Sequence, residues 1–340
     1  MFNLNKHIED IRAFKECTIE YPMLKTVIND FDELRFNFKI GNNQQCMMLT
    51  GDTGAGKSHL IRYYKSKNNE YNSNRGITIP VLFSRISDKG TLIATLAQLL
   101  KDLGQFNTPY REKLSSDLSL TESLIKLLDK CKTELIIIKE FQELIEFKSV
   151  KQRQAIGNRL KYISEKTGIP MVFSGMPWTK NIMEDPQWRS RIIIHRNLEY
   201  FKLSGETCGE SNSQIYIQLL ASLEDELPVK TTPSLKQHDI AFPLFAICKG
   251  EFRQIKLFLE KSLIQAYRDN KQVLDKETMN KTYKNIYPGK TSPSDLDINK
   301  LIVWQSISES DFNCNAEHEY DSMIPTIFEK TPLSQILKKK

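Results

Sequence analysis

The stretch Gly51-Asp52-Thr53-Gly54-Ala55-Gly56-Lys57-Ser58 fits the phosphate-binding pattern G-x-x-x-x-G-K-[S/T] at every required position. An apolar run, residues 46–49, precedes it, and a helix-like stretch beginning at His59 follows it. In this strand–loop–helix context, backbone N–H groups and the positive end of the helix dipole point into one concavity. We therefore expect Gly51 to His59 to bind a nucleotide, with Lys57 at the β- and γ-phosphates and the Ser58 hydroxyl on Mg²⁺.

Strand-like and helix-like segments alternate on both sides of this loop. Short apolar runs bounded by turn residues predict strands, and the segments between them carry helical periodicity. The predicted strands cover residues 46–49, 77–83, 134–138, 171–175 and 191–195. This alternation predicts an α/β fold with a doubly wound, parallel, five-stranded sheet, which binds its ligands at the carboxyl ends of the strands.

The rest of the chain is expected to be helical or irregular. Residues 1–40 form an N-terminal helical segment, because apolar residues recur there every three or four positions, and residues 41–204 form the α/β domain. The strand pattern stops near residue 205, so residues 205–287 are expected to form a helical lid, with helices at 213–226, 238–249, 250–268 and 275–285. Residues 288–340 are polar and are predicted to be a partly irregular tail.

Composition limits the class of protein. The 340 residues are 26% charged and 40% hydrophobic, a balance typical of globular proteins in solution. No apolar run approaches the length of a membrane span, and the six cysteines are scattered, so we expect a cytoplasmic protein without membrane contact. The formal net charge of +6 permits binding to nucleic acid without requiring it.

Polar residues at two other predicted strand ends could act on the nucleotide. Lys139 and Glu140 follow the strand at 134–138, at a position that resembles the Asp-Glu pair of additional-strand ATPases, whose glutamate polarises the attacking water. Ser174 ends the next strand, where its hydroxyl could orient that water. The plainer alternatives are a core strand that ends at the surface and an ordinary strand-end serine.

Arginines are the remaining candidates. Arg189 and Arg191 lie before the last strand, and one of them could reach the γ-phosphate of a neighbouring subunit; we favour Arg191. Arg253, in the stretch Gly250-Glu251-Phe252-Arg253, could reach the phosphates from the lid of the same chain. Ordinary surface arginines are the alternative at each position.

Together these residues resemble the AAA+ class of P-loop ATPases. Residues 51–58 are similar to its Walker A motif, 135–140 to its Walker B strand, Ser174 to sensor 1, Arg191 to the arginine finger and Arg253 to sensor 2. Within this class the chain, from about residue 8 to 285, resembles the TniB/TnsC family of transposition regulators. That likeness lies in residues 8–22, 47–58, 139–145, 173–177 and 250–283.

The resemblance implies a regulator that uses ATP and Mg²⁺, forms a ring or helical filament of identical subunits on duplex DNA, and links a target-selection protein to a transposase. It also implies that Glu140, Ser174, Arg191 and Arg253 form the catalytic set. The sequence departs from the family pattern at Lys139, which replaces an aspartate that holds Mg²⁺, so hydrolysis of ATP stays open.

Two stretches have a composition suited to sequence-independent contact with DNA phosphates. One follows the predicted strand at 77–83 and the other follows the Walker B strand; the candidates are Arg85, Lys89, Thr91, Lys148, Lys151 and Arg153. For either stretch a solvated helix face is the alternative.

Three functions remain open at this point. The leading hypothesis is an ATPase that assembles on DNA and recruits and activates a transposase. The second is a nucleotide-gated scaffold that does not hydrolyse ATP, which Lys139 favours. The third is an ATPase that resembles a helicase loader and has no role in transposition.

Overall fold

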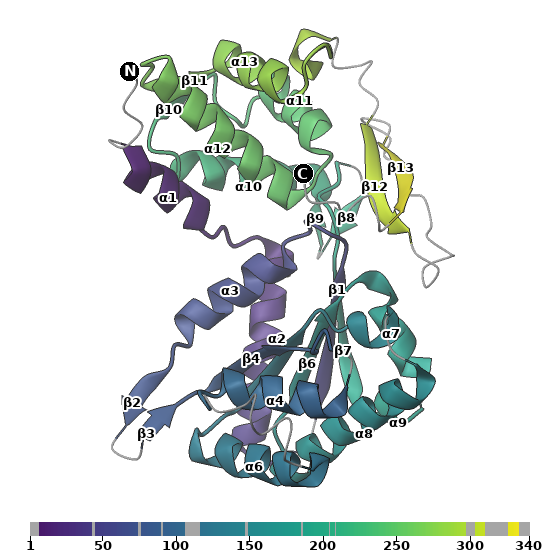
Figure 1. Cartoon of the computed structure of the whole chain (residues 1–340). Coiled ribbons are helices and arrows are strands. Elements are labelled where there is room, and N and C mark those ends of the chain that lie inside the picture. Colours follow the sequence, from purple (N-terminus) through teal and green to yellow (C-terminus); the bar gives the residue numbers. More distant parts are fainter. Residues whose placement is uncertain are drawn as a thin grey trace. The chain divides into compact units, whose positions relative to one another are not determined.

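The computed structural model describes residues 7–42, 45–73, 76–89, 91–105, 116–146, 149–184, 186–203, 205–207, 209–296, 303–309 and 326–332 (Figure 1). The chain divides into two compact units. We call residues 26–51 and 57–198 the sheet unit, and residues 1–25, 52–56 and 199–340 the lid unit.

A five-stranded parallel sheet forms the centre of the sheet unit, as the sequence predicts. Its spatial order is β4-β5-β6-β1-β7. The strands are β1 (Cys46–Gly51), β4 (Val81–Arg85), β5 (Leu135–Lys139), β6 (Met171–Gly175) and β7 (Ile192–Leu198). Since β1 pairs with both β6 and β7, the loop that follows β1 leaves the sheet beside the ends of two neighbouring strands.

The helices of the sheet unit cover the apolar faces of these strands. One core joins Met48, Ile138 and Phe173 of the sheet to helices α4 (Leu92–Asp102), α6 (Asp117–Lys130) and α8 (Val150–Thr167). Helix α3 (Lys57–Lys67) and the sheet-unit part of α2 (Pro22–Lys39) pack against each other through Phe31 and Tyr64. Shorter elements are α7 (Glu143–Glu146), η2 (Pro177–Glu184) and α9 (Pro186–Arg189).

The predicted strand at 77–83 is two strands. The hairpin β2 (Tyr71–Ser73) and β3 (Gly76–Thr78) is antiparallel, and β4 enters the sheet only after Pro80. Proline has no N–H group for a strand ladder, so the chain changes partners there.

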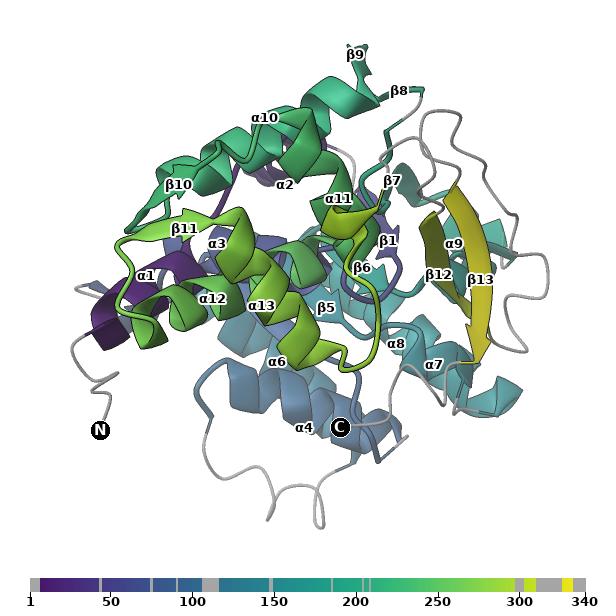
Figure 2. The ribbon, with the colours of Figure 1, turned by 90° about the horizontal axis from the view of Figure 1, so that it is seen from above.

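Helices make up most of the described part of the lid unit. They are α10 (Asn212–Asp225), α11 (His238–Cys248), α12 (Phe252–Arg268), α13 (Lys276–Ile286) and the N-terminal α1 (Ile8–Glu16), with the short η3 (Pro293–Asp295). Figure 2 shows α12 beside α1 and α13, in agreement with the hydrogen bond from Tyr267 to Asp10.

Strands also occur beyond residue 205, where the sequence predicts only helices and an irregular tail. In the described part of this region they form short pairs: β8 (Glu206–Thr207) with β9 (Glu210–Ser211), β10 (Lys230–Thr232) with β11 (Val273–Asp275), and β12 (Val303–Glu309) with β13 (Thr326–Pro332). The predicted domain boundaries near residues 40, 204 and 287 stay a prediction.

Candidate nucleotide site

The ends of the phosphate-binding loop belong to the sheet unit. Strand β1 ends at Gly51, and Lys57 is the first residue of α3. The Nζ atom of Lys57 donates a hydrogen bond to the Gly51 carbonyl at 2.5 Å. The lysine side chain therefore folds back over the start of the loop, where a phosphate group can take the place of the carbonyl as its partner.

The middle of the loop, residues 52–56, belongs to the lid unit. The Tyr200 hydroxyl donates to the Thr53 carbonyl at 2.6 Å, and the Arg253 amide donates to the Gly54 carbonyl at 3.2 Å. Burial, followed by the charges of Asp52 and Glu251, raises the pKa of Tyr200 well above its ordinary value, so this hydroxyl stays a donor. Tyr200 and Arg253 thus hold the backbone of the loop at two successive carbonyl groups.

Glu251 lies directly over Gly54. A Cβ atom built on Gly54 would be 1.9 Å from the Glu251 Oε1 atom, and Gly54 has a φ of +85°. Only glycine meets both conditions, because a side chain would clash with the carboxyl group and strain the backbone. The glycine that the motif suggested for phosphate approach therefore also makes room for a carboxyl group.

The charges around this carboxyl group shift its titration. Burial raises the pKa of Glu251 to about 7, with a smaller contribution from Asp52, while Arg253 and Lys249 oppose the shift. Near neutral pH this group is therefore divided between the neutral acid and the carboxylate.

The end of β5 carries Lys139 and Glu140. Glu140 is exposed and has a left-handed backbone, with φ of 53°. Its carboxylate accepts a hydrogen bond from the Gln142 side chain at 2.8 Å, and the other end of that side chain accepts from the Met176 amide at 3.2 Å. Gln142 thereby connects the end of β5 to the residue after β6 and fixes the direction of Glu140.

Lys139 is half-buried and lies in register with Arg85 of β4. Parallel partners in register present their side chains on the same face of a sheet, so two cations lie side by side there. Arg85 also forms an ion pair with Asp88 at 3.9 Å.

Ser174 is buried at the end of β6, in register with Leu49 of β1. Its carbonyl accepts a hydrogen bond from the Phe141 amide at 3.0 Å, so it lies beside the residue that follows Glu140. The structure thus brings Glu140 and Ser174 to the same edge of the sheet.

The three arginines differ in surroundings. Arg191 is half-buried and forms an ion pair with Glu165 of α8, whereas Arg189 is exposed. Arg253 is exposed, and its backbone amide contacts the loop.

The candidate DNA-contacting residues fall into two groups. Thr91 caps α4 by accepting a hydrogen bond from the Ala94 amide, and Lys89 lies in the turn before it. Lys151 and Arg153 lie in the first turn of α8, which has no acidic residue. Lys148 lies outside the described residues.

Sequence reasoning did not find Tyr200, Glu251 or Gln142. Glu251 is two residues before Arg253, and Gln142 is two residues after Glu140. This closeness to predicted site residues is the only indication of a role that the sequence gives for them. Tyr200 is 147 positions from its partner in the loop, so only the fold reveals its contact.

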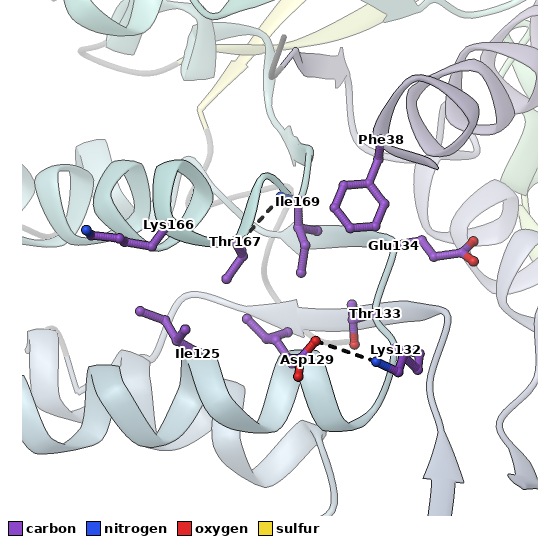
Figure 3. Close-up of a pocket in the computed structure, with 10 residues that line it drawn as sticks. Phe38, Ile125, Asp129, Lys132, Thr133, Glu134, Lys166, Thr167 and Ile169 are labelled. Carbon is purple, nitrogen blue, oxygen red and sulfur yellow. Dashed lines mark hydrogen bonds and ion pairs between the residues drawn. The ribbon is translucent and has the colours of Figure 1, made fainter. Parts of the chain in front are cut away.

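A separate cavity of about 440 Å³ lies in the sheet unit, near the amino-terminal ends of β5 and β6 (Figure 3). Phe38 and Ile169 form part of its apolar wall, and Asp129, Lys132 and Glu134 lie at its edge. Because parallel sheets bind ligands at the opposite, carboxyl edge, we do not assign this cavity to the nucleotide.

Comparison with known proteins gives one family and one fold. The sequence model of the family described as "TniB: Bacterial TniB protein" matches residues 10–202. No curated protein matches the chain in sequence.

Solved structures with similar folds include ORC and Cdc6 proteins. The ORC2 protein of Aeropyrum pernix, in ADPNP and ADP complexes, has a TM-score of 0.60 and 16% identity, over 80% of this chain and 71% of that chain. The ORC1 protein of Aeropyrum pernix, in complex with DNA, has a TM-score of 0.58 and 13% identity, over 81% and 69%. Cdc6p from Pyrobaculum aerophilum has a TM-score of 0.56 and 14% identity, over 82% of this chain and 72% of that chain.

The predicted AAA+ P-loop fold is confirmed. Within the described residues, no helix is both long and apolar enough to cross a membrane.

Proposed function

Since this chain belongs to the TniB family, we propose that it is an ATP-dependent AAA+ regulator that assembles on duplex DNA, recruits and activates a transposase, and links it to a target-selection protein. The observation that carries the proposal is the phosphate-binding loop between β1 and α3, already held in shape by Tyr200 and Arg253. A preformed loop lowers the cost of ordering the site when ATP binds.

Residues 51–59 would bind ATP, with Lys57 on the β- and γ-phosphates. For Mg²⁺, the donor set fits a nucleotide-bound ion: the Ser58 hydroxyl is exposed, and Mg²⁺ commonly takes its other ligands from phosphates and water. The ion would neutralise phosphate charge there. Lys139 supplies a cation where the family pattern has a carboxylate, so the protein gives this ion fewer oxygen ligands.

Hydrolysis would use Glu140 as the residue that polarises water and Ser174 as the residue that orients it. The hydrogen bond from Gln142 supports this role because it holds the Glu140 carboxylate in one direction. Arg253 would contact the phosphates from the lid of the same chain.

The arginine that acts between subunits is Arg191 or Arg189. Arg191 would have to leave Glu165 to reach a neighbouring subunit, and the exposed Arg189 would likewise have to leave its own contacts. ATP bound between subunits would then stabilise the polymer, and its hydrolysis would release it.

DNA would be bound through phosphates alone. The cations Lys151 and Arg153 lie in the first turn of α8, where the helix dipole already favours an anion. Arg85 ends β4 and Lys89 follows this strand, and the two would form the second contact. The fold-level likeness to a protein solved with DNA is compatible with this proposal.

A scaffold that binds ATP without hydrolysing it is the second candidate. The register of Lys139 beside Arg85 favours it, since two neighbouring cations disfavour a divalent metal at this strand end. Steady phosphate release that Glu140→Gln abolishes would rule this scaffold out.

Electron microscopy of the full chain with duplex DNA and a non-hydrolysable ATP analogue tests the main proposal. We expect rings or filaments on DNA with the analogue, and none with Lys57→Ala. Isolated monomers of the unmodified chain under these conditions would refute assembly on DNA, and a role as an ATPase that resembles a helicase loader would then be the better account.

A further inference from the structure

The C-terminal strand β12 contacts the turn that leads into the nucleotide site. Gln305 of β12 is fully buried, and its Nε2 atom donates hydrogen bonds to the carbonyl groups of Phe201 at 3.0 Å and Lys249 at 2.9 Å. All three residues belong to the lid unit. One amide group therefore joins three segments that lie far apart in the sequence.

The turn held by Gln305 has little freedom. Lys249 and Gly250 both have left-handed backbones, with φ of 55° and 69°. A Cβ atom on Gly250 would be 2.1 Å from the Phe201 carbonyl oxygen and 2.8 Å from Gln305 Nε2, so only glycine fits. The Phe201 amide in turn donates to the Gly250 carbonyl at 2.9 Å.

This turn sets the position of the residues that contact the phosphate-binding loop. Glu251, the next residue, covers Gly54, and the Arg253 amide bonds to the Gly54 carbonyl. Tyr200, next to Phe201, bonds to Thr53. The residues that contact the middle of the loop therefore lie close in sequence to the two carbonyl groups that Gln305 binds. Tyr200 is next to Phe201, and Glu251 and Arg253 follow Lys249 by two and four positions.

The free-energy cost of burying Gln305 argues against a role in packing alone. Its Oε1 atom is buried and has no hydrogen-bond partner among the described residues. An unpaired buried acceptor is unfavourable, whereas an apolar side chain would fill the same space without that cost. The two hydrogen bonds to the turn are what distinguish glutamine here.

We propose that Gln305 is a positioning residue for the nucleotide site: it holds the Lys249–Gly250 turn, and through it Glu251 and Arg253 against the loop, so that the C-terminal segment controls nucleotide affinity. This inference rests on the proposed nucleotide binding. A partner or a second subunit that displaces β12 would then change that affinity without touching the loop.

The test compares full-length Gln305→Met with the wild-type chain. Methionine has a similar length and no donor, so it removes the two hydrogen bonds together with the unpaired Oε1 acceptor. Gln265→Met is the matched control, since Gln265 is also buried in the lid unit but bonds to Asp269 and Asn285, away from the turn. Two measurements are made: amide hydrogen exchange without nucleotide, and affinity for a fluorescent ATP analogue between about pH 6 and pH 8.

We expect the amides of Phe201 and Arg253 to exchange faster in Gln305→Met, and the analogue to bind about fivefold more weakly at the acid end, as for the loss of one net hydrogen bond. We also expect the pH dependence of the affinity, which is centred near pH 7 in the wild type, to move to lower pH. The Glu251 carboxyl group would become solvated in the variant, and its pKa would then fall toward the ordinary value for glutamate. The groups that face this carboxyl are Asp52, Lys249, Arg253 and Tyr200. Gln265→Met should leave both measurements unchanged.

Wild-type exchange and a wild-type pH profile in Gln305→Met would overturn the inference. If that variant does not fold, Gln305→Glu replaces it, because its carboxylate has the same shape and cannot donate to the two carbonyls. Failure of both variants to fold would also overturn it, since Gln305 would then be required for folding. Absence of analogue binding by the wild-type chain would refute the proposed function instead, and the exchange data would still decide whether Gln305 holds the turn.

Discussion

We predict that the carboxyl group of Glu251 makes the proposed nucleotide binding sensitive to pH. Its pKa, raised by burial to about 7, would rise further beside bound phosphates, because a second negative charge disfavours the carboxylate. Binding should therefore be coupled to proton uptake and should weaken as pH rises through 7.

We predict that Glu251→Gln binds an ATP analogue with an affinity that changes much less between about pH 6 and pH 8. The wild-type affinity should fall as pH rises across this range. The total fall should be about tenfold if bound phosphate raises the Glu251 pKa by one unit. Fluorescence titration at several pH values measures this. The variant also serves as the control for protonation of the nucleotide itself, so equal slopes for the two proteins would contradict the prediction.

Lys139 offers a second prediction at this scale. Replacing it by aspartate adds an oxygen ligand at the end of β5 and removes one of two adjacent cations. We expect Lys139→Asp to raise Mg²⁺-dependent phosphate release more than about tenfold, which corresponds to about 1.4 kcal/mol of barrier.

Lys139→Gln separates the two effects, because it removes the charge without adding a carboxylate. A rise of equal size in both variants would show that repulsion alone limits turnover. No rise in either would mean that the lysine does not limit it.

The sequence predicts the part of the site that is contiguous in the chain. Gly51 to Ser58 is recognisable because phosphate binding needs a fixed spacing of glycine, lysine and serine, and Glu140 is found because it follows a buried strand. The contacts of Tyr200 and Gln305 escape prediction. Each contact is a hydrogen bond to the backbone carbonyl of a residue that lies far away in the sequence. Because any residue can supply such a carbonyl, the sequence does not reveal the partner.

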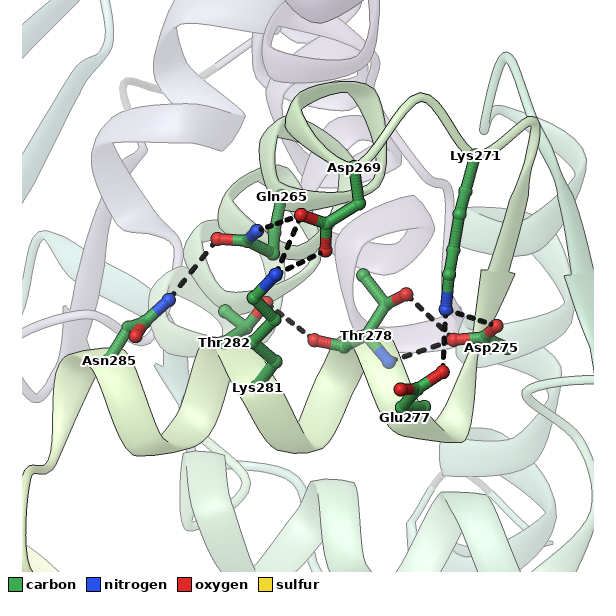
Figure 4. A network of polar contacts seen from close by, with 9 residues as sticks. All are labelled: Gln265, Asp269, Lys271, Asp275, Glu277, Thr278, Lys281, Thr282 and Asn285. Atoms are coloured by element: carbon green, nitrogen blue, oxygen red, sulfur yellow. Dashed lines mark hydrogen bonds and ion pairs between the residues drawn. The ribbon is translucent and has the colours of Figure 1, made fainter.

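Helix α13 is held in place by a polar network with α12 and β11 (Figure 4). Asp275 caps the helix by accepting bonds from the Thr278 amide at 2.8 Å and the Thr278 hydroxyl at 2.7 Å, and Lys271 donates to it at 2.9 Å. Burial acts to raise the pKa of Asp275, but these hydrogen bonds outweigh it and lower the pKa.

We predict that Asp275→Ala lowers the free energy of unfolding by about 1 kcal/mol, the usual value of a helix cap. An asparagine side chain can still cap a helix, so Asp275→Asn should lower the free energy of unfolding by less than Asp275→Ala does. The decrease that remains in Asp275→Asn measures the charge interaction with Lys271. Because the folded pKa lies below the unfolded one, the carboxylate's contribution is present above about pH 4 and is lost as pH falls through the folded pKa. Urea unfolding at neutral and acid pH measures both, and a smaller loss in Asp275→Ala than in Asp275→Asn would contradict the assignment.

Element prediction succeeds where burial dictates the pattern. Residues 135–138 of β5 and 171–173 of β6 are apolar throughout, so these strands follow from sequence alone. Strand β12 is different. Its residue Gln305 is fully buried, although its polarity would assign it to the surface.

The chain alternates between the two units along the phosphate-binding loop. Gly51 and Lys57 belong to the sheet unit, and residues 52–56 belong to the lid unit.

We predict that a saturating ATP analogue raises the unfolding temperature of the chain in a single calorimetric transition. At a ligand concentration of about 100 times Kd, the gain in unfolding free energy is about 2.7 kcal/mol. Lys57→Ala should unfold at the wild-type temperature without ligand and show no gain with it. Two transitions, only one of them shifted by the analogue, would show that the units respond separately.

The path of the chain limits how this protein can be taken apart. It passes from one unit to the other after residues 25, 51, 56 and 198, and two of those passages border the short segment 52–56. No single truncation can therefore separate the units, because a fragment ending near residue 198 keeps residues 52–56 but loses Tyr200, Glu251 and Arg253, which hold them. Fragments chosen for crystallisation, for two-hybrid screens or for fusion to another domain should keep the lid with the sheet, and insertions are better placed at the β2–β3 hairpin than near residue 198.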